Sequence, residues 1–171
     1  MERKRKRRVA AGVVLATLAA LGLLSLFIRT PYLVLTNAET GQLLHLTPFT
    51  EGETFSIHYL HSLNQSPVTE FYELRGGQLM LTALEFETFG AGMPTSLEPG
   101  QTLTRLETGA MRIDGFERKI PELHYLIGHA AELTLRIGDD DIPLESLDRA
   151  GQSIQFSPRL LNMWQRLYFK R

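Results

Sequence analysis

Hydrophobic residues form one unbroken run near the start of the chain. Six consecutive basic residues, 3–8, precede twenty residues without a charge, 9–28, and Arg29 ends the run. Twenty residues of α-helix rise about 30 Å, which is the thickness of the hydrocarbon core of a bilayer. An excess of Lys and Arg on one flank favours the cytoplasmic side for that flank. The pattern predicts a single-pass signal anchor in the inner (cytoplasmic) membrane, with a cytoplasmic N-terminus and the bulk of the chain extracytoplasmic or periplasmic.

Two other interpretations of this segment stay open. A cleaved secretory signal peptide also has a basic start and an apolar centre, but that centre usually spans about 7–15 residues and ends at a small-x-small site. The run here is longer, and residues 24–29 are bulky where a cleavage site would need alanine. A core helix of a soluble protein is the third interpretation, and it is disfavoured because nothing would shield six adjacent cations.

Beyond residue 30 the dominant period of the hydrophobic pattern is two. Residues 54–60 and 68–74 alternate apolar and polar side chains, as half-buried strands do. Gly76-Gly77 then supplies the positive φ angles of a tight hairpin and leads into another strand at 78–87. Further strands are predicted at 32–36, 42–46, 102–107, 111–113, 133–137 and 153–156. Short strands with turn signals about every 8–12 residues predict an all-β domain over residues 30–157, either a compact antiparallel sandwich or a small barrel.

Two segments depart from the alternating pattern. Residues 121–128 are ambiguous and are compatible with one short helix. At the C-terminus, Ser157-Pro158 suits a helix cap and first helical position. Apolar residues then recur at steps of three and four, at Leu160, Leu161, Trp164, Leu167 and Tyr168.

This spacing predicts a short amphipathic helix over residues 158–171. In one interpretation the helix lies on the membrane surface; in the other it plugs the open end of a β-barrel. The candidate residues for the membrane interface are Arg29, Trp164, Tyr168 and Phe169. The chain is thus expected to have three parts: a basic N-terminus and anchor at 1–29, a β-domain at 30–157, and a terminal helix.

The charge balance changes once the first 29 residues are set apart. The chain has 18 basic and 19 acidic residues and a formal net charge of −1. Seven of the basic residues and one acidic residue lie in 1–29, so residues 30–171 carry 11 basic and 18 acidic residues, a net charge of −7. An acidic domain argues against nucleic-acid binding, which needs clustered cations. The absence of cysteine excludes disulfides, thiolate catalysis and zinc–thiolate sites.

Titratable side chains gather on consecutive predicted hairpin strands, at His58, His61, Glu70, Glu73, Glu85 and Glu87. Imidazole and carboxylate groups on one sheet face can hold a divalent ion or serve as acid and base. His58 and His61 differ in parity, however, and Glu85 lies on the face opposite Leu84. We therefore expect no catalytic residue, metal site or cofactor. A metal-dependent or hydrolytic envelope enzyme using His58, His61, Glu70 and Glu85 is kept as an alternative.

Two motifs in this region carry a family resemblance. His61-Ser62 precedes Ser66-Pro67-Val68-Thr69-Glu70-Phe71-Tyr72, and Gly90-Ala91-Gly92-Met93-Pro94 follows about twenty residues later. This combination resembles the bacterial family called domain of unknown function 1850. That family typically shows a His-Ser start, a proline, a glutamate near an aromatic residue, and a Gly-Ala-Gly-x-Pro loop. The resemblance covers most of residues 33–157, although many members carry Trp where this chain has Val68 or Tyr72.

The resemblance implies an association and no activity. Members are often encoded beside tripartite ATP-independent periplasmic (TRAP) transporters of the TAXI type, and no catalytic residue is established for them. We therefore expect a membrane-anchored extracytoplasmic accessory or binding module for a TRAP permease or solute receptor, with the lipid bilayer as a second partner through residues 9–28. The candidate recognition or structural patch is His61, Ser62, Pro67, Glu70, Tyr72, Gly90, Ala91, Gly92, Met93 and Pro94. In the other interpretation this patch only braces a hairpin crossing, and a structural envelope protein is a further alternative.

Overall fold

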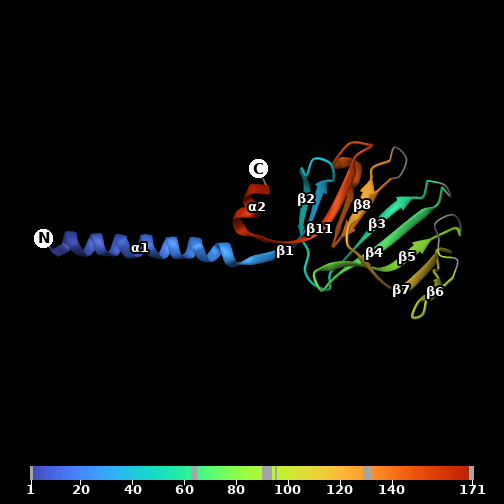
Figure 1. Ribbon diagram of the computed structural model, residues 1–171, viewed down its shortest axis with the longest axis horizontal. Helices are drawn as coiled ribbons and strands as arrows, with labels where there is room; N and C mark the ends of the chain where they lie inside the picture. Colours follow the sequence, from blue (N-terminus) through green and yellow to red (C-terminus); the bar gives the residue numbers. More distant parts are fainter. Residues whose placement is uncertain (1, 63–64, 90–93, 95, 129–131, 170–171) are drawn as a thin grey trace. The chain divides into compact units, whose positions relative to one another are not determined.

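The structure is a computed structural model that describes residues 2–62, 65–89, 94, 96–128 and 132–169, without the side chains of 3–11. The chain forms two compact units, Tyr32–Arg159 and the pair of segments Met1–Pro31 and Leu160–Arg171. Its elements, labelled in Figure 1, are α1 Glu2–Phe27, β1 Arg29–Asn37, β2 Leu43–Pro48, β3 Thr54–Leu60, β4 Pro67–Arg75, β5 Gln78–Phe86, β6 Thr102–Arg105, β7 Met111–Ile120, β8 Leu123–Leu126, β9 Thr134–Ile137, β10 Asp140–Pro143, the short 3-10 helix η1 Leu144–Ser146, β11 Ser153–Asn162 and α2 Met163–Phe169.

The strands form two mostly antiparallel sheets. The four-stranded sheet has the order β2-β1-β11-β8, and the seven-stranded sheet has the order β10-β9-β3-β4-β5-β7-β6. Each order runs between two edge strands, so the described strands form no closed barrel. Of the two predicted architectures, the sandwich matches the structure. Sequence alternation could not decide this, because closure depends on pairings between distant strands.

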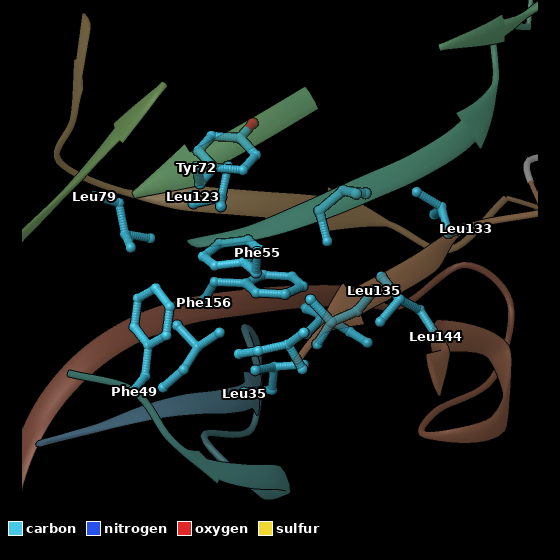
Figure 2. Packing of buried hydrophobic residues seen from close by; sticks show 14 of the residues in the cluster. Leu35, Phe49, Phe55, Tyr72, Leu79, Leu123, Leu133, Leu135, Leu144 and Phe156 are labelled. Atoms are coloured by element: carbon cyan, nitrogen blue, oxygen red, sulfur yellow. The ribbon is translucent and has the colours of Figure 1, made fainter. Parts of the chain in front are cut away.

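The two sheets face each other across a hydrophobic core, and a smaller buried cluster lies on the seven-stranded sheet at Val68, Leu84, Phe86 and Ile113. Leu33 and Leu35 from β1 and Phe156 from β11 pack in the same buried cluster as Phe55 and Tyr72 from β3 and β4. Figure 2 shows Phe55 between the sheets; its ring centroid lies 5.9 Å from that of Phe156 and 5.1 Å from that of Tyr72. Inward residues from both sheets therefore join the layers. Burial on β4 follows the predicted period of two at Val68, Tyr72 and Leu74, whereas β1 is buried continuously from Tyr32 to Asn37.

The β4–β5 hairpin forms where its turn signal predicts. Gly76 and Gly77 have φ angles of +60° and +72°, a conformation that glycine adopts without the steric cost other residues meet. The Glu51 carboxylate accepts hydrogen bonds from the amides of both glycines. These hydrogen bonds tie the loop before β3 to the β4–β5 hairpin.

Two predictions about secondary structure are corrected. Residues 123–126, in the ambiguous segment, form strand β8, which pairs with β11. The C-terminal helix starts at Met163 and not at Pro158, because β11 continues to Asn162. Pairing of β11 with β8 ends at Phe156, so Pro158 lies on a stretch of strand with one open side, where its missing N–H is tolerated.

The N-terminal segment is helical, but its predicted role is not supported by the structure. Within the described residues, no helix is both long and apolar enough to cross a membrane. The side chains of residues 9–11, the first three of the segment predicted to span the bilayer, lie outside the described residues. Membrane anchoring through residues 9–28 accordingly stays a prediction.

Candidate functional site

Strands β3 and β4 carry Glu70 to the inner face of the seven-stranded sheet. Glu70 pairs in register with Ile57, and Val68 pairs with Tyr59. Ile57 and Val68 are almost completely buried, which identifies the face that they share as the one turned toward the core. Because residues two apart on a strand point to the same side, Glu70, Tyr59 and Tyr72 all belong to that face.

Three tyrosine hydroxyls surround the Glu70 carboxylate. The Tyr72 hydroxyl donates to Oε2 over 2.7 Å, and the Tyr59 hydroxyl donates to Oε1 over 3.3 Å. The Tyr125 hydroxyl also donates to Oε2 and lies 2.8 Å from the Tyr72 hydroxyl. We call Glu70, Tyr59, Tyr72 and Tyr125 the Glu–Tyr cluster. Tyr125 comes from β8 of the other sheet, so the cluster joins the two layers through polar contacts.

Burial sets the protonation of the three phenols. Desolvation is the main cause that raises the pKa of Tyr59, Tyr72 and Tyr125 above the ordinary tyrosine value. The negative charge of Glu70 raises the pKa of each phenol further. All three hydroxyls therefore keep their protons at neutral pH and act as donors. Hydrogen bonds from a neutral donor to an ionised acceptor are stronger than neutral pairs, so the cluster is well suited to hold the sheets together.

The residues of the alternative enzyme hypothesis do not meet. Thr69 pairs in register with both His58 and Glu85, which places these two on the outer face, opposite Glu70. His58 Nδ1 lies 3.0 Å from the Thr69 hydroxyl. Glu85 forms an ion pair with Arg112 over 2.6 Å. Among the described residues, no group of three or more His, Cys, Asp or Glu side chains is placed to hold a metal ion.

The rest of the predicted patch is only partly placed. The His61 amide donates to the Ser66 carbonyl over 2.9 Å, and Pro67 opens β4 opposite Leu60. Ser62 is exposed, and its carbonyl accepts from the Gln65 side chain. Pro94 is half-buried, whereas Gly90, Ala91, Gly92 and Met93 lie outside the described residues.

Of the predicted patch, the structure thus brings Glu70 and Tyr72 into direct contact. Sequence reasoning did not identify Tyr59 and Tyr125 as their partners. For Tyr59 a signal existed, since it continues the inward series of Phe55 and Ile57 on β3. For Tyr125 the alternation of apolar and polar residues was too short to show which way the side chain points, because β8 has four residues.

A separate hollow of about 830 Å³ lies elsewhere on the sandwich. It is bounded by the connection from β2 to β3 and by the β9–β10 hairpin, and its lining includes Phe49, Glu53, Ser56, Arg136 and Asp140. None of the described residues of the predicted patch lines it. Its mixed apolar and charged walls distinguish it from the Glu–Tyr cluster, where the polar atoms bond one another.

Fold and site together define an antiparallel β-sandwich domain whose two sheets are joined by a glutamate–tyrosine cluster. The family model described as domain of unknown function (DUF1850) matches residues 55–144, more than half of the chain, and the chain belongs to this family. The matched region contains all four residues of the Glu–Tyr cluster. The family membership predicted from the His-Ser and Gly-Ala-Gly-x-Pro motifs is thereby confirmed. Comparisons with curated proteins and with solved structures found no match.

Proposed function

We propose that this protein is a membrane-anchored extracytoplasmic binding module that serves a TRAP transporter of the TAXI type. The observation that carries the anchoring is the apolar surface of α1. Over its described side chains, α1 exposes large hydrophobic residues at Val13, Val14, Leu15, Leu18, Leu21, Leu23, Leu24, Leu26 and Phe27.

Between residues 13 and 27, these side chains leave the helix without a continuous polar face. At 100° per residue, positions 13, 14, 15, 18, 23 and 27 already point in directions spread around the whole circumference. A helix that is apolar all round is suited to burial in protein or in lipid, and it is poorly suited to water. The uncharged run of the sequence, 9–28, has the length that lipid requires.

The orientation follows from the flanking charges. The basic run at 3–8 favours a cytoplasmic N-terminus, which would leave the sandwich on the extracytoplasmic side. A net charge of −7 over residues 30–171 suits a protein or solute partner better than nucleic acid. Because members of the family are often encoded beside TRAP transporters, we infer that the partner is a TRAP permease or its solute receptor.

Co-purification tests the transporter partnership. The full chain carrying an affinity tag is extracted in a mild detergent from cells that also express a TAXI-type TRAP permease and its solute receptor. The matched control keeps residues 1–31 and replaces the sandwich with an unrelated folded domain. Recovery of permease or receptor with the full chain and not with the control supports the proposal. Clean separation of the full chain from both proteins contradicts it.

A further inference from the structure

Helix α2 presents large apolar and aromatic side chains that are exposed among the described residues. Met163, Trp164, Leu167 and Tyr168 are 44%, 50%, 52% and 78% exposed, and none of the α2 residues is buried. The helix is nonetheless well started at Asn162. The Asn162 side chain accepts from the Gln165 amide over 2.9 Å, and the Gln165 side chain accepts from the Asn162 amide over 3.0 Å. This reciprocal capping box stabilises a helix that gains little from burial.

A hydrogen bond from Trp164 to Ser25 ties α2 to α1 within their common unit. The Trp164 indole N–H donates to the Ser25 hydroxyl over 3.0 Å, and that hydroxyl donates to the Gly22 carbonyl over 2.6 Å. Ser25 lies in the last turn of α1, three residues before the apolar run ends at Ile28. Three residues of helix correspond to about 4.5 Å, so the indole is joined to α1 just inside the end of its apolar segment.

The charges around α2 have one sign. Arg159 and Arg166 are the charged residues between positions 159 and 169, and no acidic residue lies in this stretch. Apolar and aromatic side chains combined with Arg are the composition of helices that lie in the interface of a bilayer with anionic lipids. Tryptophan in particular concentrates at the level of the headgroups, where its ring is in apolar surroundings and its N–H finds a partner.

We propose that α2 is an interfacial helix that lies among the headgroups of an anionic bilayer at the outer end of α1, positioned by the bond from Trp164 to Ser25. The inference rests on the proposed membrane anchoring through α1. It assigns the exposed face of α2 to lipid, and not to a second copy of the chain or to another protein. Basic charge beside the exposed apolar side chains is the reason for that choice.

The test uses Trp164 as its own probe, since the chain contains one tryptophan. The full chain is reconstituted into vesicles of phosphatidylglycerol and phosphatidylethanolamine, in which bromine atoms are carried either near the headgroup or near the end of the acyl chains. We expect strong quenching of tryptophan fluorescence by the shallow bromines and weak quenching by the deep ones. Equal quenching at both depths, or none at either, overturns the proposal.

Variants separate this proposal from the anchoring on which it rests. Leu167→Glu is expected to abolish most of the shallow quenching while the protein still sediments with the vesicles. Leu126→Glu replaces a leucine that is 63% exposed on the sandwich, and we expect it to leave the quenching unchanged. Ser25→Ala is expected to shift the depth profile of Trp164 without loss from the vesicles.

Three further outcomes have distinct meanings. If the wild-type chain fails to sediment with vesicles, the proposed anchoring is wrong and the inference falls with it. If the chain sediments but Trp164 stays unquenched, only the inference is wrong. Crosslinking of α2 to a second copy in place of quenching also overturns it.

Discussion

Replacing Tyr125 with phenylalanine removes one hydroxyl from the contact between the two sheets and leaves the ring in place. That hydroxyl donates to the Glu70 carboxylate and lies 2.8 Å from the Tyr72 hydroxyl. The ring keeps its packing against Phe156, at 5.8 Å between centroids, and against Tyr59, at 6.1 Å. Since a hydrogen bond to a charged group contributes about 1.5–3 kcal/mol, we expect the free energy of unfolding to fall by that amount.

The size of the effect is expected to follow the geometry of each bond. Tyr72→Phe removes a 2.7 Å bond and is expected to cost about as much as Tyr125→Phe, roughly 1.5–3 kcal/mol. Tyr59→Phe removes a 3.3 Å bond and is expected to cost less, about 0.5–1.5 kcal/mol. Combining the Tyr72 and Tyr125 changes gives less than the sum of the two, because both phenols bond the same oxygen.

The assay is urea unfolding of the full chain in mild detergent, followed by near-ultraviolet circular dichroism of the sandwich aromatics. Tyr168→Phe is the matched control, since Tyr168 is 78% exposed on α2, and we expect its effect to stay within about 0.5 kcal/mol. The reasoning is refuted if Tyr125→Phe unfolds at the same urea concentration as the wild type. A larger loss from Tyr59→Phe than from Tyr72→Phe would also refute it.

Other predictions address pH, backbone geometry and capping. The pKa values of the three cluster tyrosines are raised in the folded state. Their contribution to stability is therefore complete below the unfolded tyrosine pKa of about 10 and is lost as pH rises above that value. In urea titrations above pH 10, the free energy of unfolding is expected to fall less with pH for Tyr125→Phe than for the wild type. Gly115→Ala is expected to lower the free energy of unfolding by about 1–3 kcal/mol, because Gly115 has a φ of +86° and an added Cβ would collide with the Gly100 carbonyl. Gly41→Ala is the control, since Gly41 has open space around it, and it is expected to cost less in the same urea assay. Asn162→Ala is expected to weaken α2 by about 0.5–2 kcal/mol, seen as faster amide exchange in α2 with unchanged exchange in the sandwich.

Local alternation explains which strands the sequence could predict. β3 occupies the expected residues, Thr54–Leu60, because its apolar and polar residues alternate and its neighbours supply turn signals. The two glycines at 76–77 likewise located the β4–β5 hairpin. What alternation cannot supply is the partner of each strand, since the pairing of β3 with β9 joins residues about 80 positions apart.

The candidate site shows the same limit. Glu70 and Tyr72 attracted attention because a motif contains both, but their meaning depends on Tyr125, which arrives from the other sheet. A four-residue strand such as β8 has too few residues for its period to be recognised. The parity argument did separate Glu85 from the inward residues correctly, because it needs only the alternation of a single strand.

At the C-terminus, one sequence motif predicted the wrong start for the helix, and a second motif marks the observed start. Ser157-Pro158 has the composition of a helix start, yet β11 runs through it and buries Leu161 at 4% exposure. Asn162 and Gln165, spaced as a capping box, mark the observed start of α2. A cap composition therefore predicts a helix start only where no strand partner competes for the same backbone.

Protease treatment of intact spheroplasts tests membrane anchoring and orientation in one measurement. The chain carries one epitope at its N-terminus and one within the sandwich turn at residues 38–41, which is exposed and follows β1. Anchoring with a cytoplasmic N-terminus predicts that all of the chain sediments with the membrane, that external protease removes the sandwich epitope, and that the N-terminal epitope survives until the membrane is permeabilised. Release of the untreated chain into the soluble fraction, or loss of the N-terminal epitope to external protease, would contradict the proposal.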